Sequence, residues 1–270
     1  MGPTGGTRFQ KQTFPPLAAS LTRAFLAWRT SLWQSFDSKR LTVRSTLCGL
    51  VSRGGLWSRV FESENYRKVG NVPPEIMKAL LEYHSRLGAA FSSIDVQSLG
   101  RLVNLLLDCR LAGNTVLLAG NGGSASTVNH FAIDWMLGSG LANPGLPVVS
   151  LAESSSSLTA TANDMSFDQV FARQVTALGR PGDLLIVVSA SGNSRNLIDA
   201  VSASRDAQMT SLSITAFDGG FLKDLADENV HVQTDHGDYG VAEDCHLAIG
   251  HMVKEALVHH RLAMSHGMEE

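Results

Sequence analysis

The chain has 270 residues, of which 44% are hydrophobic and 17% charged, and this balance is typical of a globular protein of one or two domains with a buried core. Its formal net charge of −3 and the lack of an apolar run that approaches a membrane span argue against nucleic-acid binding and against membrane insertion. Three scattered cysteines, Cys48, Cys109 and Cys245, match no metal-binding spacing and favour a reduced, cytoplasmic protein.

The first segment, residues 1–70, differs in composition from the rest of the chain. It is rich in Lys and Arg, and Asp37 is the only acidic residue before Glu62. Such a composition is typical of a transit peptide, but also of a disordered extension, a basic interaction arm, or upstream sequence included by a wrong start. Because no hydrophobic period is sustained, we expect a disordered or non-native extension here and one folded domain over residues 71–265.

Two helices are expected to open this domain. Pro74 followed by Glu75 suits a helix start, and apolar residues recur at helical spacing over Ile76–Phe91. A second helix is expected over Val96–Leu111, where Gly113 should end it.

Beyond this helical pair, short apolar strands alternate with helices. The expected strands are Val116–Ala119, Val148–Leu151, Leu184–Ser189, Ser211–Thr215 and Val230–Gln233. The expected helices are Ser124–Leu137, Ser156–Ala162, Phe167–Ala177, Ser194–Arg205, Phe221–Ala226 and Val241–Met264. This alternation predicts an α/β fold with a doubly wound, parallel, five-stranded sheet flanked by helices. Ligands of such sheets bind beyond the carboxyl ends of the strands.

The first glycine-rich turn follows the strand Val116–Ala119 directly. Its sequence, Gly120-Asn121-Gly122-Gly123-Ser124, offers small residues, backbone N–H groups and a hydroxyl, and it leads into a helix. The partial positive charge at a helix N-terminus favours anions, so this turn predicts an anion site. The same helix carries His130 and Asp134, and their spacing of four places both on one helix face.

A second turn, Ser189-Ala190-Ser191-Gly192-Asn193-Ser194, repeats this arrangement after the strand that begins at Leu184. Three hydroxyls and a run of backbone N–H groups before a helix suit a phosphate group. A simple helix cap would need only one Ser or Asn, so two such turns at one sheet edge favour phosphate binding. Neither turn matches a dinucleotide-binding fingerprint or a Walker loop.

The last predicted helix carries a further carboxylate and a further imidazole. Glu243 and His251 are eight positions apart, which allows them to share one broad helix face. Taken alone, they are better explained as a hydrogen-bonded pair in the core. With His130 and Asp134 they would complete a set of two imidazoles and two carboxylates, which suits zinc or another divalent metal, one per site. Asn163-Asp164 could bind sugar hydroxyls or cap the next helix.

Several motifs, in their order along the chain, together resemble the sugar isomerase (SIS) domain. They are Gly120–Ser124, His130 four before a carboxylate, Leu158-Thr159-Ala160, Asn163-Asp164, Phe167–Phe171, Pro181–Asp183 and Ser191–Ser194. The resemblance covers about Pro73 to Ala263 and is closest to the phosphoheptose isomerase branch. It implies a flavodoxin-like sandwich, a homotetramer with active sites between subunits, and a phosphosugar substrate.

The resemblance also implies an activity and the roles of single residues. The branch interconverts sedoheptulose 7-phosphate and D-glycero-D-manno-heptose 7-phosphate through an enediolate, which requires a base, an acid and a cation. Asp134 occupies the position of the base and His251 that of the acid. The metal ligands would be His130, Asp134, Glu243 and His251. The substrate and its phosphate would be bound by Asn121, Gly122, Gly123, Ser124, Asp164, Ser189, Ser191, Asn193 and Ser194.

Four departures from the family pattern alter this site. Asp134 stands where the family has a Glu, and a misplacement near 1 Å can cost on the order of a hundredfold in rate. Glu243 replaces a Gln, Ala190 replaces a Thr, and no Arg occurs over residues 134–146. We expect a phosphosugar isomerase. The alternative is a non-catalytic SIS-domain protein that binds phosphosugars or acts in regulation, of the type that associates with the bacterial replication initiator.

Overall fold

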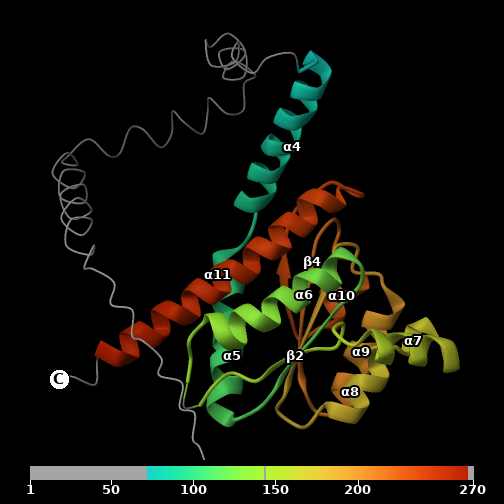
Figure 1. Cartoon of the computed structure of the whole chain (residues 1–270), viewed down its shortest axis with the longest axis vertical. Coiled ribbons are helices and arrows are strands. Elements are labelled where there is room, and N and C mark those ends of the chain that lie inside the picture. Colours follow the sequence, from blue (N-terminus) through green and yellow to red (C-terminus); the bar gives the residue numbers. More distant parts are fainter. Residues whose placement is uncertain (1–71, 143, 267–270) are drawn as a thin grey trace, which may run out of the picture. The chain divides into compact units, whose positions relative to one another are not determined.

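A parallel five-stranded sheet forms the centre of the part of the chain that the computed structural model describes, residues 72–142 and 144–266 (Figure 1). The strands are β1 (Val116–Gly120), β2 (Val148–Ser150), β3 (Leu184–Ser189), β4 (Thr210–Thr215) and β5 (Glu228–His231). Their spatial order, β2-β1-β3-β4-β5, is that of flavodoxin-like sheets. The predicted α/β class and doubly wound sheet are therefore confirmed, whereas the extension expected over residues 1–70 lies outside the described residues.

Helices connect the strands and cover both faces of the sheet. They are α4 (Pro74–Ser92), α5 (Val96–Ala112), α6 (Gly123–Ile133), α7 (Ser155–Asp164), α8 (Ala172–Leu178), α9 (Arg195–Asp206), α10 (Gly220–Leu225) and α11 (Tyr239–His266). Two shorter segments complete the set, the π-helical turn η2 (Asp134–Gly138) and the 3-10 turn η3 (Phe167–Gln169). Among the helices of the described residues, none is both long and apolar enough to cross a bilayer.

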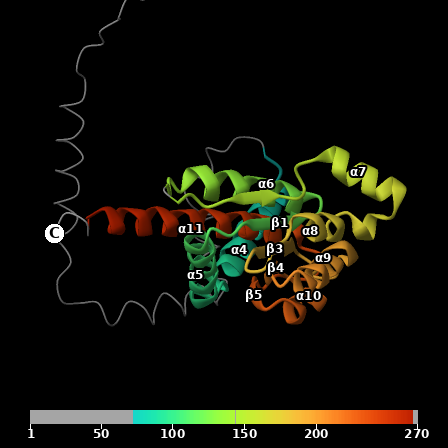
Figure 2. The ribbon, with the colours of Figure 1, turned by 90° about the horizontal axis from the view of Figure 1, so that it is seen from below.

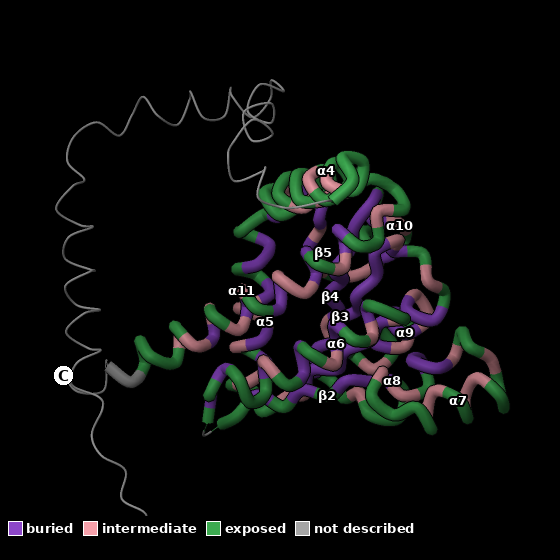
Figure 3. Tube along the Cα trace, turned by 45° about the horizontal axis from the view of Figure 1, so that its top comes forward, coloured by how far each residue is buried: buried purple, intermediate pink, exposed green. Residues whose placement is uncertain are grey.

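Side-chain alternation along the strands divides the core into two layers. Leu118 and Ile186 point to the layer that α5, α6 and α11 cover. Leu117 and Leu185 point to the opposite layer, which α8 and α9 cover. Figure 2 shows these two groups of helices on either side of the strands. Burial on both faces explains why the strands read as continuous apolar runs, and Figure 3 shows the buried residues concentrated along them.

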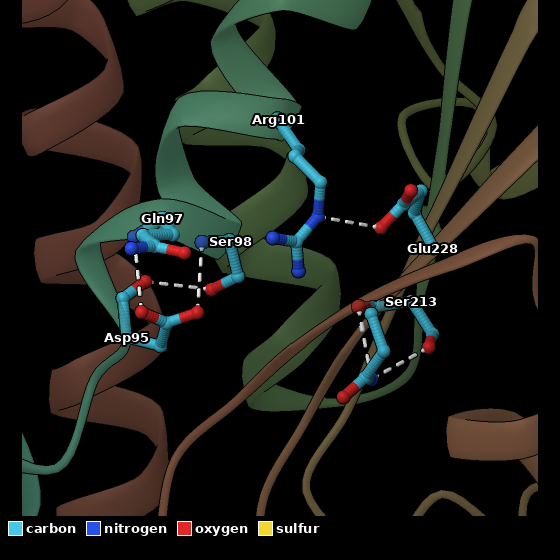
Figure 4. A network of polar contacts seen from close by, with 7 residues as sticks. Asp95, Gln97, Ser98, Arg101, Ser213 and Glu228 are labelled. Carbon is cyan, nitrogen blue, oxygen red and sulfur yellow. Dashed lines mark hydrogen bonds and ion pairs between the residues drawn. The ribbon is translucent and has the colours of Figure 1, made fainter.

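Helix α5 is held at its start and along its length by polar contacts (Figure 4). The Asp95 carboxylate accepts hydrogen bonds from the backbone N–H groups of Gln97 and Ser98, both at 3.0 Å, and so caps the helix. The Arg101 Nε donates to the Glu228 carboxylate of β5 at 2.9 Å. The second of these contacts ties α5 to the edge strand of the sheet.

Several predicted boundaries differ from the structure. Strand β5 begins at Glu228 rather than Val230, because its pairing with β4 covers Leu212 to Thr215 and ends there. The helix predicted to run to Leu137 widens into the π-helical turn η2 from Asp134 onward. The helix predicted over Phe167–Ala177 is divided into η3 and α8.

Candidate active site

Two helices that lie side by side, α6 and α11, carry the candidate catalytic residues (Figure 1). Gly123 at the start of α6 lies against Glu243, and Phe131 further along α6 lies against Gly250. The Trp135 Nε1 donates a hydrogen bond to the Gly250 carbonyl at 3.0 Å. The two helices therefore run in the same direction. The contact of Gly123 with Glu243 is followed, about two turns further along both helices, by the contact of Phe131 with Gly250.

At the C-terminal end of α6, three of the four predicted metal ligands converge. The Nε2 atoms of His130 and His251 lie 3.1 Å apart. The Asp134 Oδ2 lies 3.5 Å from the first of these atoms and 3.7 Å from the second. We call these three residues the His–Asp–His group. Its potential ligand atoms all lie within 4.8 Å of one another.

The spacing of the His–Asp–His group fits a divalent metal. Donor atoms held about 2.1 Å from a tetrahedral zinc ion are about 3.4 Å apart, close to the separations within this group. Two imidazoles and one carboxylate are also a donor set that zinc accepts, with one position left for water or substrate. The residues present are therefore suited to hold zinc or another borderline divalent ion.

The carboxylate of this group is more sheltered than its imidazoles. The side chains of His130 and His251 are 49% and 51% exposed, whereas that of Asp134 is 20% exposed. Asp134 is also the first residue of the π-helical turn η2, a local widening that recurs at functional sites in proteins. The group thus presents two accessible imidazoles around a carboxylate that is partly withdrawn from water.

A lysine that the sequence analysis did not single out lies near the same carboxylate. The Lys254 Nζ donates to the Glu255 carboxylate at 2.9 Å. That hydrogen bond, followed by the charges of Glu255 and Asp134, raises the pKa of Lys254. Lys254 lies three positions after His251 and therefore on the same side of α11, which is the signal that could have identified it.

The two predicted phosphate turns meet in one pocket of about 160 Å³. Strands β1 and β3 are neighbours, and Gly120 pairs with Val188, so the turns that follow them emerge at the same sheet edge. The lining residues are Asn121, Ser124, Val188, Ser189, Ala190, Ser191, Ser194, Leu197, Tyr239 and Glu243. We call this cavity the hydroxyl pocket, because four of the predicted phosphate-binding serines line it.

Hydrogen bonds hold the walls of the hydroxyl pocket in place. The Ser189 hydroxyl accepts from the Gly192 backbone N–H at 3.1 Å, and the Ser191 hydroxyl accepts from the Asn193 N–H at 3.3 Å. The side-chain amides of Asn121 and Asn196 donate to each other at 2.9 Å and so join the first turn to the start of α9. These hydrogen bonds fix the positions of the side chains that line the pocket.

Several predicted site residues do not line the pocket in this chain. The Asn193 side chain points to α10, where its oxygen accepts from the Phe221 N–H at 3.2 Å. Asp164 is exposed at the end of α7 and accepts from the Asn163 amide at 2.9 Å. Gly122 and Gly123 are exposed and form the turn into α6, where Gly122 takes a positive φ of 54°. Ligand contacts by these four residues remain predictions.

Glu243, the predicted fourth metal ligand, does not belong to the His–Asp–His group. It lines the hydroxyl pocket and lies against Gly123, where an added Cβ would overlap its carboxylate. Eight positions along α11 separate it from His251, a rise of about 12 Å. Helical periodicity predicts a shared face for these two residues but carries no information on how far apart they lie along the axis.

One residue that lines the pocket, Tyr239, and one that supports its wall, Asn196, were not predicted from the sequence. Tyr239 lines the pocket because α11 begins at that residue, two positions before the predicted start at Val241. Asn196 is buried and holds Asn121. A buried amide in the first turn of a helix was a signal for a structural hydrogen bond, but only the fold shows its partner.

Close to the sheet edge, α11 buries an imidazole that the proposed chemistry does not use. His246 is fully buried, and neither ring nitrogen has a hydrogen-bond partner among the described residues. Burial lowers the pKa of His246 from 6.5 to about 4, because the charged imidazolium cannot be solvated there. His246 is therefore neutral at physiological pH.

Comparisons with known proteins agree with this fold. Residues 81–216 match the family model of the SIS domain. The chain is 38% identical over 184 residues to a phosphoheptose isomerase of Chlorobium phaeobacteroides, covering 66% of this chain and 80% of that protein. It is 35% identical over 181 residues to a phosphoheptose isomerase of Alteromonas mediterranea, covering 67% of this chain and 91% of that protein.

A solved structure gives the same result. The phosphoheptose isomerase of Neisseria gonorrhoeae superposes with a TM-score of 0.60 at 32% identity, covering 68% of this chain and 96% of that one. The fold and the site define a class of α/β proteins in which a parallel sheet carries serine-lined turns at the carboxyl ends of its strands. The chain belongs to the SIS domain family and, within it, to the family of the phosphoheptose isomerases.

Proposed function

We propose that this protein is a phosphosugar aldose–ketose isomerase that interconverts sedoheptulose 7-phosphate and D-glycero-D-manno-heptose 7-phosphate. One observation carries the proposal: the hydroxyl pocket and the His–Asp–His group lie at the two ends of α6, where that helix packs on α11. The first can move protons, and the second can receive a phosphate group. Relatives at 35–38% identity that are named phosphoheptose isomerases support it.

The distance between the two ends supports a long phosphosugar. Glu243 at the pocket and His251 in the group are eight residues apart on α11, about 12 Å along the helix axis. A seven-carbon chain with a phosphate on its last carbon can place the phosphate among the serines and its carbonyl end toward the imidazoles. A triose phosphate is too short to do both.

The residues of the His–Asp–His group divide the proton transfers between them. Asp134 removes the proton from C1 of the ketose and returns it to C2, so that C–H bonding shifts by one carbon. His251 exchanges protons with the two oxygens as the carbonyl moves from C2 to C1. Since one proton leaves and one returns, the isomerisation needs no redox cofactor.

Zinc or another divalent ion, one per site, is the cofactor that we propose for this centre. His130, Asp134 and His251 would hold it, which their mutual distances of 3.1, 3.5 and 3.7 Å support. When bound, the ion supplies a positive charge that polarises the carbonyl and stabilises the developing oxyanion. Glu243 is not part of this ligand set, because its carboxylate lies against Gly123.

We propose that uncharged protein groups bind the phosphate of the substrate. Ser124, Ser189, Ser191 and Ser194 supply hydroxyls, and α6 and α9 direct their N-termini toward the pocket. Ala190, which stands where the family has a Thr, removes one further hydroxyl from this wall.

A turnover assay tests the proposal. The purified protein is incubated with zinc and sedoheptulose 7-phosphate, and formation of the aldose is followed by NMR. We expect turnover with this substrate and little with pentose or triose phosphates. Absence of turnover over a panel of ketose phosphates would refute the assignment and favour the non-catalytic alternative.

We also propose that the protein assembles as a homotetramer. Large apolar side chains are exposed on α4 and around the end of α6, and such patches favour contacts with other chains. They are Ile76, Leu80, Ile133 and Leu137, with exposed fractions of 50%, 59%, 57% and 65%. Light scattering coupled to size-exclusion chromatography tests this, and a monomeric mass would exclude it.

A further inference from the structure

The hydroxyl pocket has an unusual charge for a phosphate site. Among the described residues that line it, Glu243 is the only ionised side chain, and none is a lysine or an arginine. Phosphate sites normally combine hydroxyls and backbone N–H groups with positive charge. Here the serines and helix N-termini supply the first kind of interaction, while the one charged side chain repels a phosphate.

The position of Glu243 places this charge where the anion would be held. The carboxylate lies against Gly123, the first residue of α6, so closely that a Cβ at that position would overlap it. The first turn of a helix is where the unpaired N–H groups and the positive end of the helix dipole favour a negative charge. Glu243 thus occupies the region of the pocket that best stabilises an anion.

The packing of α11 on α6 explains why Glu243 lies there. Gly250 lies against the Phe131 ring and accepts a hydrogen bond from Trp135, which fixes the register of the two parallel helices. Two turns earlier along α11, the same register brings Glu243 to Gly123. The absence of a side chain at Gly123 leaves the space that the carboxylate fills.

From these contacts we infer that Glu243 is a tethered competitor of the substrate phosphate and sets the affinity and selectivity of the hydroxyl pocket. The inference rests on the proposed function, in which this pocket receives the phosphate of the sugar. A phosphate that enters must displace the carboxylate from the N-terminal turn of α6 and then remain beside it.

The expected penalty is large enough to measure. A carboxylate about 5 Å from a phosphate dianion weakens binding roughly tenfold even at the dielectric constant of water, and more strongly in a partly buried pocket. The pocket should therefore bind a free phosphate dianion weakly, and a ligand should gain affinity from its sugar rather than from its phosphate alone. Removing the charge of Glu243 should increase the affinity of the pocket for the free phosphate dianion.

The test compares Glu243→Gln with wild type in the full-length protein. Gln keeps the size and hydrogen-bonding reach of the side chain and removes its charge. Asp244→Asn is the matched control, because it removes the same charge one residue further on α11, where the carboxylate accepts from the Tyr83 hydroxyl at 2.6 Å instead of facing the pocket. Calorimetry measures the binding of inorganic phosphate and, separately, of zinc, and thermal unfolding checks that each variant is folded.

We expect Glu243→Gln to bind inorganic phosphate at least about tenfold more tightly than wild type, with zinc affinity unchanged and Asp244→Asn equal to wild type. Equal or weaker phosphate binding by Glu243→Gln would overturn the inference. A loss of zinc affinity in this variant would also overturn it, because it would show that Glu243 is a metal ligand. If wild type turns over sedoheptulose 7-phosphate in either case, the proposed function stands. If no variant binds phosphate and none turns over, the proposed function fails and the inference with it.

Discussion

Replacing Asp134 with Asn tests the chemical role of the His–Asp–His group most directly. The amide has the same shape as the carboxylate, so the side chain can remain beside the two imidazoles, from which the Asp134 Oδ2 lies 3.5 and 3.7 Å. What it loses is the negative charge and the ability to accept a proton from carbon. General-base catalysis contributes about 10²–10⁴-fold to the rate, so kcat should fall by that factor. This corresponds to about 3–5 kcal/mol of activation free energy.

The assay follows aldose formation from sedoheptulose 7-phosphate in D₂O by NMR. Wild type should form an aldose that carries deuterium at C2, because the base exchanges its proton with solvent before returning it. Asp134→Asn should form little product of either isotopic composition, and excess zinc should not restore the rate. Asp108→Asn is the control, because it removes an exposed carboxylate of α5 that belongs neither to the His–Asp–His group nor to the hydroxyl pocket. An Asp134→Asn enzyme that keeps more than about a tenth of the wild-type kcat would refute the assignment of Asp134 as the base.

Three further predictions address the metal, the phosphate and the buried histidine. A chelator should abolish turnover, and added zinc should restore it. His130→Ala should bind zinc more weakly in a calorimetric titration. Activity that survives full removal of metal would contradict the proposed cofactor. Ser189→Ala removes a pocket hydroxyl that also accepts the hydrogen bond of the Gly192 N–H. KM should therefore rise about tenfold with little change in kcat. Steady-state kinetics in which kcat falls and KM is unchanged would exclude a role in binding. Because the folded-state pKa of His246 is about 4 and its ordinary value is 6.5, the unfolded chain binds the proton first. The contribution of His246 to stability is therefore complete above pH 6.5 and falls by about 3 kcal/mol as the pH drops to about 4. Urea unfolding at several pH values measures this slope, and His246→Leu should flatten it; parallel slopes for the two proteins would disprove the mechanism.

The sequence by itself determined the local units of this protein and their chemistry. The strands β1 and β3, buried on both faces, read as short apolar runs, and the Gly- and Ser-rich turns after them marked the ligand-binding edge. The pairing of His130 with Asp134 also followed from sequence, since a spacing of four fixes two side chains on one helix face. These features depend on backbone geometry within a few residues, which local sequence controls.

Only the tertiary structure decided which of these units meet. His251 joins His130 because α6 and α11 pack in parallel at the register that Phe131, Trp135 and Gly250 fix. The same register brings Glu243 to Gly123 and into the hydroxyl pocket, outside the His–Asp–His group. Helical periodicity predicts the direction of a side chain around its own axis, but the axial alignment of two helices depends on the packing of side chains from distant parts of the chain. For that reason the sequence identified the candidate side chains, while the fold decided that Asp134 lies with the two imidazoles and Glu243 with the serines of the hydroxyl pocket.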